Sequence, residues 1–421
     1  MAFMRMTAGA AFRPAGGLEG SPNAVPIRIL MQQPSLAKYR IAVYGELCRR
    51  PGISLHVLHS ASDGIPNESA EGFTAEGTNA WFLPWPLNRL EWHALPRRRL
   101  SREKFDLLIL TWNIRHVSLL PHIIRARLRG IPVVVWGHGA SKQERPMRRY
   151  LRWSLTRLAS AVIVYSHAVA DTLTRSGYNP ARMFVALNTI DQRGIQAARA
   201  HWLARPAELA TFRARHGLAK GPHLLFVSRL MPENRTEVLI RAAALLRKDF
   251  PDLQVTIVGT GRSEALLKAE VARLGLEGCV RFTGAIYADM DLAPWFLSAD
   301  VFAYPSNIGL SLLHAFGFGV PVVVGRSQHL HGPEIDALRP GQNGAVFIHD
   351  DERDLARVLR ALLADPEHLR AMGRAAHETA TEEFTLKRMV DGIEAAVRFA
   401  AAQAVLQEIH AATSDGPAVA I

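Results

Sequence analysis

The chain has 421 residues, 48% of them hydrophobic and 21% charged, which is the composition of a globular protein and excludes an intrinsically disordered one. This length exceeds what one hydrophobic core usually organises, so we expect two domains. The two cysteines, Cys48 and Cys279, form no disulfide framework and no metal-binding pattern, and no run approaches the roughly 18 apolar residues of a membrane span. These properties favour a cytoplasmic protein, with a flexible tail at residues 1–25 that lacks the apolar core of a signal peptide.

The formal net charge of +12 calls for an anionic partner or surface. Basic residues gather in two clusters close to aromatic ones, an arrangement that favours docking on an anionic membrane surface. A solvated helix face over core aromatics explains the clusters equally well, and we expect no nucleic-acid partner because no known binding module accompanies the charge. The clusters consist of Arg97, Arg98, Arg99, Arg102 and Lys104, after Trp81, Trp85 and Trp92, and of Arg145, Arg148, Arg149, Arg152 and Arg157 around Trp153.

Short apolar segments predict β-strands that alternate with helices along almost the whole chain. Continuous Val, Ile and Leu runs of this length are typical of parallel strands covered on both faces, which helices connect in βαβ units. The expected strands are at 27–30, 55–58, 107–110, 133–136, 161–165 and 184–187 in the first half, and at 224–227, 254–258, 280–283, 301–304, 320–324 and 345–348 in the second.

The alternation stops once, between Asp191 and Lys220, in a stretch rich in Ala and Arg without a strand signal. We expect the junction between two domains there. The predicted fold class is therefore α/β, with two doubly wound Rossmann-like domains at 26–195 and 196–395 that face a central cleft. Residues 411–421 are expected to form a second flexible tail.

One segment, Tyr304–Val324, combines several features of a ligand site. The strand that ends at Tyr304 is followed by Pro-Ser-Asn, a helical run and a Gly-x-Gly-x-Pro turn into the next strand. This order places a loop and a helix N-terminus at the carboxyl end of a strand, where open α/β sheets bind ligands. The free N–H groups of such a helix end suit a phosphate group.

Four motifs follow one another in the second half of the chain: Ser228–Glu233 (SRLMPE), Val255–Gly261 (VTIVGTG), Val280–Gly284 (VRFTG) and Tyr304–Val324. In this order they resemble the donor-site signatures of the retaining, GT-B-fold glycosyltransferases of family 4, also called group 1. The resemblance extends over roughly residues 27–398. It also implies that the last helix, at about 396–410, packs back on the N-terminal domain.

The resemblance implies an enzyme that moves a hexose-type sugar from a nucleotide-diphosphate sugar to a glycan or polyprenyl-linked acceptor, with retention. A surface polysaccharide pathway on the inner face of a membrane is the setting that it implies. One alternative is a non-catalytic relative that binds sugar nucleotides or assembly partners. Another is a GT-B enzyme such as a sugar-nucleotide epimerase, which needs no acceptor.

The resemblance assigns the donor diphosphate to Arg229, whose guanidinium fork binds two oxygens at once. Where the family usually has a lysine, this chain has Asn234, and Arg235 is the candidate substitute. Ser306 and His314 stand where the family usually has a pair of glutamates, so hydroxyl and imidazole groups would meet the sugar and the ribose. Further donor-binding candidates are the backbone and side chains of Gly259, Gly261, Asn307, Ile308, Gly309, Leu310 and Glu334.

In the first half, His138 directly follows a buried strand and is expected to contact the donor sugar or the acceptor, as a catalytic residue together with Arg229. Lys38 and Arg40, after the first strand, are candidates for an acceptor phosphate, and Ser166 is a weaker candidate for the same side. No metal is expected, because no Asp-x-Asp motif or cluster of His and Cys ligands is apparent and positive groups can neutralise the diphosphate.

Overall fold

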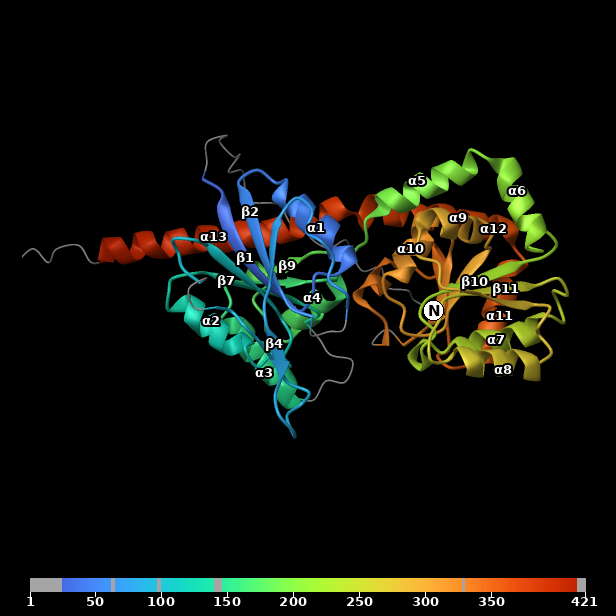
Figure 1. Cartoon of the computed structure of the whole chain (residues 1–421), viewed down its shortest axis with the longest axis horizontal. Coiled ribbons are helices and arrows are strands. Elements are labelled where there is room, and N and C mark those ends of the chain that lie inside the picture. Colours follow the sequence, from blue (N-terminus) through green and yellow to red (C-terminus); the bar gives the residue numbers. More distant parts are fainter. Residues whose placement is uncertain (1–24, 62–64, 97–99, 140–145, 328–329, 415–421) are drawn as a thin grey trace, which may run out of the picture.

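A computed structural model of the protein describes residues 25–61, 65–96, 100–139, 146–327 and 330–414. The expected tail at 1–25 lies outside these residues except for Val25, and so does the Arg97–Arg99 run of the first basic cluster. Two parallel β-sheets, each flanked by helices, make up the two halves of the molecule (Figure 1). In the described part of the chain, no helix combines the length and the apolar character that crossing a membrane requires.

The N-terminal sheet has seven parallel strands in the order β3-β2-β1-β6-β7-β8-β9. The strand order reverses between β1 and β6. The strands are β1 (Ile27–Gln33), β2 (Ile53–His59), β3 (Thr74–Gly77), β6 (Leu107–Thr111), β7 (Val133–Gly137), β8 (Ala161–Val164) and β9 (Met183–Val185). The helices are α1 (Lys38–Cys48), α2 (Leu119–Arg127), α3 (Pro146–Arg157) and α4 (His167–Arg175).

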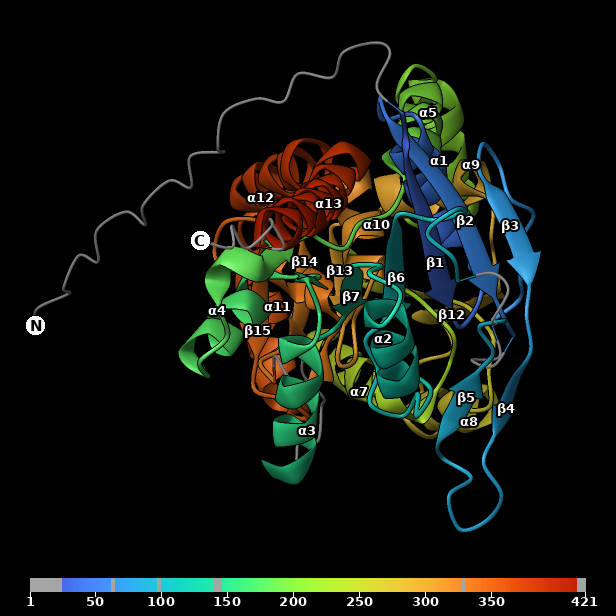
Figure 2. The ribbon, with the colours of Figure 1, turned by 90° about the vertical axis from the view of Figure 1, so that its left-hand side faces the viewer.

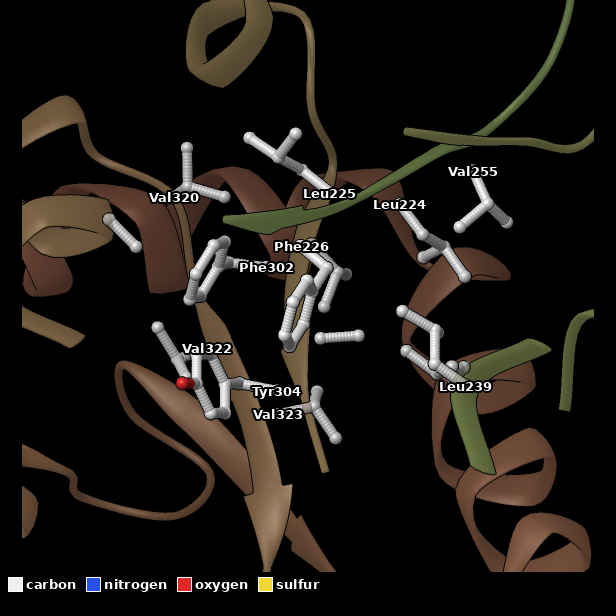
Figure 3. Packing of buried hydrophobic residues seen from close by; sticks show 14 of the residues in the cluster. Leu224, Leu225, Phe226, Leu239, Val255, Phe302, Tyr304, Val320, Val322 and Val323 are labelled. Carbon is white, nitrogen blue, oxygen red and sulfur yellow. The ribbon is translucent and has the colours of Figure 1, made fainter. Parts of the chain in front are cut away.

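The C-terminal sheet has six parallel strands in the order β12-β11-β10-β13-β14-β15, which reverses between β10 and β13. Figure 3 shows its core, where Phe226 of β10 packs beside Phe302 and Tyr304 of β13. The strands are β10 (His223–Val227), β11 (Gln254–Val258), β12 (Val280–Gly284), β13 (Val301–Tyr304), β14 (Val322–Gly325) and β15 (Gly344–Phe347). The helices are α7 (Thr236–Leu246), α8 (Glu264–Arg273), α9 (Asp289–Leu297), α10 (Ser311–Phe318), α11 (Glu352–Leu363) and α12 (Pro366–Glu378).

All twelve expected strands are present, and three others were missed. The sequence of β3 (TAEG) has no apolar run, and β4 (Ala80–Phe82) and β5 (Glu91–His93) are only three residues long. β4 and β5 pair antiparallel and form a hairpin that extends away from the N-terminal sheet (Figure 2). The strand-free stretch around Asp191–Lys220 contains α5 (Gln192–Leu203) and α6 (Pro206–Arg215), and Ile195 of α5 is buried in the C-terminal core.

The last helix, α13 (Leu386–Ser414), runs from the C-terminal half across the N-terminal sheet (Figure 1). Met389, Ile393 and Val397 are buried in the N-terminal core together with residues of α1, β1 and β7. The helix starts about ten residues before the expected 396–410 segment and continues through Ser414, into the expected tail at 411–421, whose remainder lies outside the described residues. At Gly392 it passes so close to β9 that a Cβ atom would lie 2.2 Å from the carbonyl oxygen of Val185.

Replacing Gly392 by alanine therefore tests how much α13 fastens the two halves. Helix propensity alone would stabilise the variant by about 1 kcal/mol. The clash with a backbone carbonyl must instead move the helix, so we expect the free energy of unfolding in urea to fall by about 1–3 kcal/mol. Ala402→Gly on the exposed face of the same helix is the control, and it should lose about 1 kcal/mol by propensity alone. A more stable Gly392→Ala variant would contradict the close contact.

Candidate functional site

The site is built where β10 and β13 lie side by side at the carboxyl edge of the C-terminal sheet. Open α/β sheets bind ligands where the strand order reverses, because the loops on either side diverge there. The loop after β10 starts with Ser228 and Arg229, and the loop after β13 spans Pro305–Leu310. The hydroxyl of Tyr304 donates a hydrogen bond to Ser228 Oγ at 2.8 Å and joins the two loops.

Gly259 and Gly261 shape the first loop without presenting side chains of their own. A Cβ atom on Gly259 would lie 1.9 Å from the carbonyl oxygen of Ser228, and one on Gly261 would lie 2.4 Å from that of Leu230. Gly259 also has a φ of 143°, which L-residues rarely adopt. The two glycines thus allow the turns after β10 and β11 to stack, and this stacking fixes the backbone that carries Arg229.

The guanidinium of Arg229 is the exposed cation of this loop. Arg229 forms no ion pair within the described residues, although Glu233 and Tyr304 lie close enough for their pKa values to be affected by its charge. An exposed guanidinium without a carboxylate partner can bind two oxygens of an anion at little cost in broken contacts.

The loop after β13 offers backbone donors beside Arg229. His331 holds this loop, because its Nδ1 accepts a hydrogen bond from Ile308 N at 3.2 Å while its Nε2 donates to the carbonyl oxygen of Gly325 at 2.7 Å. Within the described residues, the N–H groups of Gly309 and Leu310 have no hydrogen-bond acceptor. These groups precede the N-terminus of α10, where the helix dipole also favours negative charge.

The residue at the expected lysine position, Asn234, has a structural role. Its side chain is buried, with Nδ2 donating to the carbonyl oxygen of Arg229 at 2.7 Å and Oδ1 accepting from Asn307 Nδ2 at 3.5 Å. The amide thus joins the loops after β10 and β13.

The expected substitution by Arg235 is not seen. The Nε atom of Arg235 lies 2.9 Å from Asp350 Oδ1 and 3.2 Å from Glu237 Oε1, so two carboxylates already pair with its charge. The backbone of Arg235 is left-handed, with φ 55°, and this conformation ends the short 3₁₀ turn before α7. Its side chain therefore leaves the loop at a different angle from that of a regular helical residue.

Ser306 and His314 stand at the two positions where the family usually has glutamates, and the structure shows what surrounds each of them. Ser306 is buried, with 3% of its surface exposed. His314 lies with its Nε2 atom 3.1 Å from Asp289 Oδ1, and its ring stacks on Phe318 with 5.5 Å between ring centres. A carboxylate is thus present beside the second position, but it comes from the first turn of α9 and not from α10.

Glu334 connects the two halves of the molecule through a hydrogen bond, and its contact with a ribose stays a prediction. Its Oε1 accepts a hydrogen bond from Asn188 Nδ2, in the segment between the two sheets, and its Oε2 has no hydrogen-bond partner among the described residues. Burial raises the pKa of this carboxyl group above its ordinary value of 4.5, and the side chain of Asn188 and the charge of Arg40 oppose the shift. In the same turn (Pro333–Ala337), Asp336 Oδ2 accepts from Ala168 N of α4 at 3.2 Å.

On the N-terminal side, His138 and Arg40 converge on Tyr165. His138 is exposed, and the centre of its ring lies 4.8 Å from that of Tyr165. Arg40 is buried, donates to Tyr165 Oη at 2.9 Å and stacks over Trp136 at 4.8 Å. These contacts bring two of the expected N-terminal site residues together at the carboxyl ends of β7 and β8.

The other two acceptor-side candidates lie apart from this group. Ser166 is buried and caps α4, because its Oγ accepts a hydrogen bond from Val169 N at 3.2 Å. Its hydroxyl therefore caps the helix end, and contact with an acceptor stays a prediction. Lys38 is exposed in the first turn of α1.

The structure also gathers a group of possible metal ligands that the sequence analysis missed. Glu91, His93 and His116 place one ligand atom each within 4.8 Å of one another. The sequence motifs did not reveal this group, and the expectation that no metal is bound stays a prediction. The Glu-x-His spacing could have indicated this group, because residues two apart in a strand have their side chains on the same face. The strand itself, β5, was not predicted from the sequence.

The raised pKa of Glu334 predicts a pH dependence of stability. Because the folded state binds this proton more tightly, the free energy of unfolding should fall as pH rises from 4.5 through the raised folded pKa and then stay level. Glu334→Gln keeps the acceptor for Asn188 and should remove this loss, as measured by urea unfolding across the range. Glu270→Gln is the control with opposite sign, since Arg273 and Arg241 lower the pKa of Glu270 to about 2, so that its contribution is lost as pH falls. Identical pH profiles for Glu334→Gln and the unmodified protein would contradict the assignment.

Two family models match the chain and together cover most of both halves. The model "Glycosyltransferase Family 4" matches residues 43–193, and the model "Glycosyl transferases group 1" matches residues 210–379. Over its full length, the Anabaena protein HepE, solved in complex with UDP, superposes on 89% of this chain with a TM-score of 0.67 and 19% identity, which concerns the fold alone.

Curated relatives are similar to parts of the chain. The GDP-mannose-dependent alpha-(1-6)-phosphatidylinositol monomannoside mannosyltransferase of Mycolicibacterium smegmatis is 34% identical over 42% of this chain and 48% of its own length. The D-inositol 3-phosphate glycosyltransferase of Pseudarthrobacter chlorophenolicus is 29% identical over 77% of this chain and 76% of its own. The chain thus spans about half the length of the first of these relatives and about three quarters of the second. With both halves matched and two parallel sheets meeting at their loops, the chain belongs to the group 1, family 4 glycosyltransferases and has their GT-B fold.

Proposed function

We propose that the protein transfers a hexose-type sugar from a nucleotide-diphosphate sugar to a glycan or polyprenyl-linked acceptor, with retention of configuration. The observation that carries this proposal is the unpaired guanidinium of Arg229 on the loop after β10, together with the free N–H groups of Gly309 and Leu310 on the loop after the adjacent strand β13. These donors surround the point where the strand order reverses, and a diphosphate is the anion that both kinds of donor suit.

The chemistry requires stabilisation of a leaving diphosphate more than it requires a carboxylate nucleophile. As the bond to the sugar breaks, negative charge develops on the diphosphate, and Arg229 and the helix end stabilise that charge without a metal. The leaving oxygen then takes the proton of the attacking acceptor hydroxyl on the same face. His138, exposed beside Tyr165, is the group that we assign to the sugar and acceptor side.

The named substrates of the relatives support a phosphorylated or lipid-linked acceptor. One relative is named as a phosphatidylinositol monomannoside mannosyltransferase and another as a D-inositol 3-phosphate glycosyltransferase, so both names give a substrate that contains a phosphate. In this chain Lys38 is an exposed cation at the start of α1, at the carboxyl end of β1. We propose the inner face of a membrane, in surface polysaccharide biosynthesis, as the place of this reaction.

A second candidate function is a non-catalytic protein that binds sugar nucleotides or assembly partners. Three observations favour it: Asn234 is neutral and buried, Arg235 is paired with Asp350, and His314 is paired with Asp289. Together with Ser306 at the first glutamate position, they leave this chain without the cation and the two glutamates that the family usually brings to a donor.

Thermal unfolding with nucleotide sugars distinguishes these functions. A donor present at 100 times its dissociation constant should add about 2.7 kcal/mol of stability. Arg229→Ala should weaken that donor about tenfold to a hundredfold, because a charge-assisted hydrogen bond contributes about 1.5–3 kcal/mol. The panel should contain UDP-, GDP-, ADP- and dTDP-sugars. Arg273→Ala, which removes an exposed arginine of α8, is the matched control and should leave the shift unchanged.

The outcomes separate cleanly when transfer is measured alongside binding. Stabilisation by one nucleotide class that Arg229→Ala reduces to about 0.4–1.4 kcal/mol, with sugar transfer to a membrane extract, supports the transferase. The same stabilisation without transfer supports the non-catalytic protein, and isomerisation of the donor without an acceptor supports an epimerase. Stabilisation that is as large in Arg229→Ala as in the unmodified protein would contradict the donor site described above.

We propose the β4–β5 hairpin as the part that contacts the membrane. Its tip carries Trp85, 83% exposed, and Leu87, 52% exposed, while Trp81 stacks on Trp92 at 6.3 Å across the two strands. Aromatic and apolar side chains on an exposed tip can enter the interfacial region of a bilayer. The basic Arg97–Arg99 run that follows β5 in the sequence adds attraction to anionic lipid.

Vesicle binding tests this surface. The double variant Trp85→Ser, Leu87→Ser should bind vesicles of phosphatidylcholine and phosphatidylglycerol at least tenfold more weakly in a sedimentation assay, because two large apolar side chains are lost from the interface. Tyr287→Ser is the control, since Tyr287 is 85% exposed in the C-terminal half. Equal binding by the double variant and the unmodified protein would exclude the hairpin as the contact.

A further inference from the structure

Glu91, His93 and His116 form a compact buried group beside the switch point of the N-terminal sheet. Glu91 and His93 point from the same face of β5, while His116 follows β6 in the segment before α2. An isolated β-bridge pairs Glu91 with His116, with Val117 N donating to the carbonyl oxygen of Glu91 at 2.9 Å. His93 is 0% and His116 5% exposed, so the backbone register brings two imidazoles and a carboxylate together away from solvent.

The separations within this group suit one metal ion. Glu91 Oε2 lies 3.2 Å from His93 Nε2 and 3.7 Å from His116 Nε2. Ligands about 2.0–2.1 Å from a tetrahedral Zn²⁺ lie about 3.3 Å from one another. The ring centres of the two histidines are 4.2 Å apart, so a single ion can reach both.

Hydrogen bonds around His93 turn its lone pair toward the carboxylate. Ser60 Oγ donates its one proton to the carbonyl oxygen of Pro34 at 2.8 Å, so it must accept from His93 Nδ1 at 3.3 Å. In a neutral imidazole the lone pair is then on Nε2, which faces Glu91. Metal-binding histidines are typically held in this way, with the other ring nitrogen donating to a fixed acceptor.

His116 has its Nε2 in the same role. Asn113 Oδ1 accepts from Arg115 N at 3.0 Å, which leaves Asn113 Nδ2 facing His116 Nε2 at 3.4 Å and places the lone pair of the imidazole on Nε2. A metal ion would take this lone pair in place of the amide of Asn113. His116 is 5% exposed, so its imidazole lies away from solvent. A proton shared between Glu91 and His93 would satisfy one contact of the group, whereas a divalent cation satisfies all three.

We propose that Glu91, His93 and His116 bind one Zn²⁺ ion, with a water molecule as the fourth ligand, and that the ion fastens the β4–β5 hairpin to the segment after β6. Two imidazoles and one carboxylate favour Zn²⁺ over Mg²⁺ and Ca²⁺, which prefer oxygen ligands alone. His122 Nε2 donates a hydrogen bond to the carbonyl oxygen of His93 at 2.8 Å and so holds β5 in place. The proposal does not depend on the transferase activity, because none of the three residues belongs to the donor site.

Metal content of the full-length, tag-free protein tests the site. After treatment with EDTA, addition of Zn²⁺ and dialysis, mass spectrometry should find one zinc per chain. Co²⁺ in its place should give the visible absorption bands of tetrahedral coordination. Glu91→Gln and His116→Gln should each weaken Zn²⁺ binding at least a hundredfold, measured by competition with a chromogenic chelator. His56→Gln is the matched control, because His56 Nε2 lies 3.7 Å from Glu76 Oε2 on neighbouring strands of the seven-stranded sheet, outside the cluster.

A second readout follows the hairpin itself. Zn²⁺ should slow hydrogen exchange of the backbone between Ala80 and His93 in the unmodified protein and leave it unchanged in Glu91→Gln, a variant that keeps the size and polarity of the side chain. Should His116→Gln fail to fold, as judged by circular dichroism, Glu91→Gln and the Co²⁺ spectrum decide the matter. Absence of bound zinc after dialysis, or equal zinc content in the unmodified protein and Glu91→Gln, would overturn the proposal.

Discussion

The candidate donor site depends on one constraint, the parallel pairing of β10 with β13 at the point where the strand order reverses. Because the chain winds away from this point in both directions, the loops that follow these two strands have no helix between them. Tyr304 and Asn234 fasten the loops to each other through side-chain hydrogen bonds. Every group that we assign to the diphosphate, namely Arg229 and the N–H groups before α10, is positioned by this pairing.

The electrostatics of the site depend on which charged side chains are already paired with a group of opposite charge. Arg235 is neutralised by Asp350 and Glu237, and Asn234 carries no charge, so Arg229 is the exposed side-chain cation of the loop after β10. The N–H groups of Gly309 and Leu310 contribute partial positive charge without a formal charge that would need a counter-ion. The loss of two glutamates reduces negative charge near the diphosphate as well. A site with fewer charges of both signs can thus keep its attraction for an anion.

Twelve strands of the two sheets could be predicted from the sequence, because most of them are runs of Val, Ile and Leu, and the loops of the candidate donor site follow directly after two of these strands. The partners of individual side chains could not. His314 pairs with Asp289 from another helix, 25 positions earlier, and Arg235 pairs with Asp350 after the last strand. Such contacts are set by the packing of helices on the sheet, and no local pattern records them. The β4–β5 hairpin was missed for the same reason, since its register depends on the segment after β6.

The carboxyl group of Glu334 lies between two parts of the chain, the segment that joins the two sheets and the loop after β13. One oxygen accepts from Asn188, between the two sheets, while the other lies close to Gly309, where a Cβ atom would be 3.8 Å away. A diphosphate on the N–H groups of Gly309 and Leu310 would bring negative charge toward this buried carboxyl group, and the raised pKa of Glu334 lets it stay neutral more readily there. The same side chain therefore contacts the segment between the two sheets and lies beside the loop that carries the candidate N–H donors.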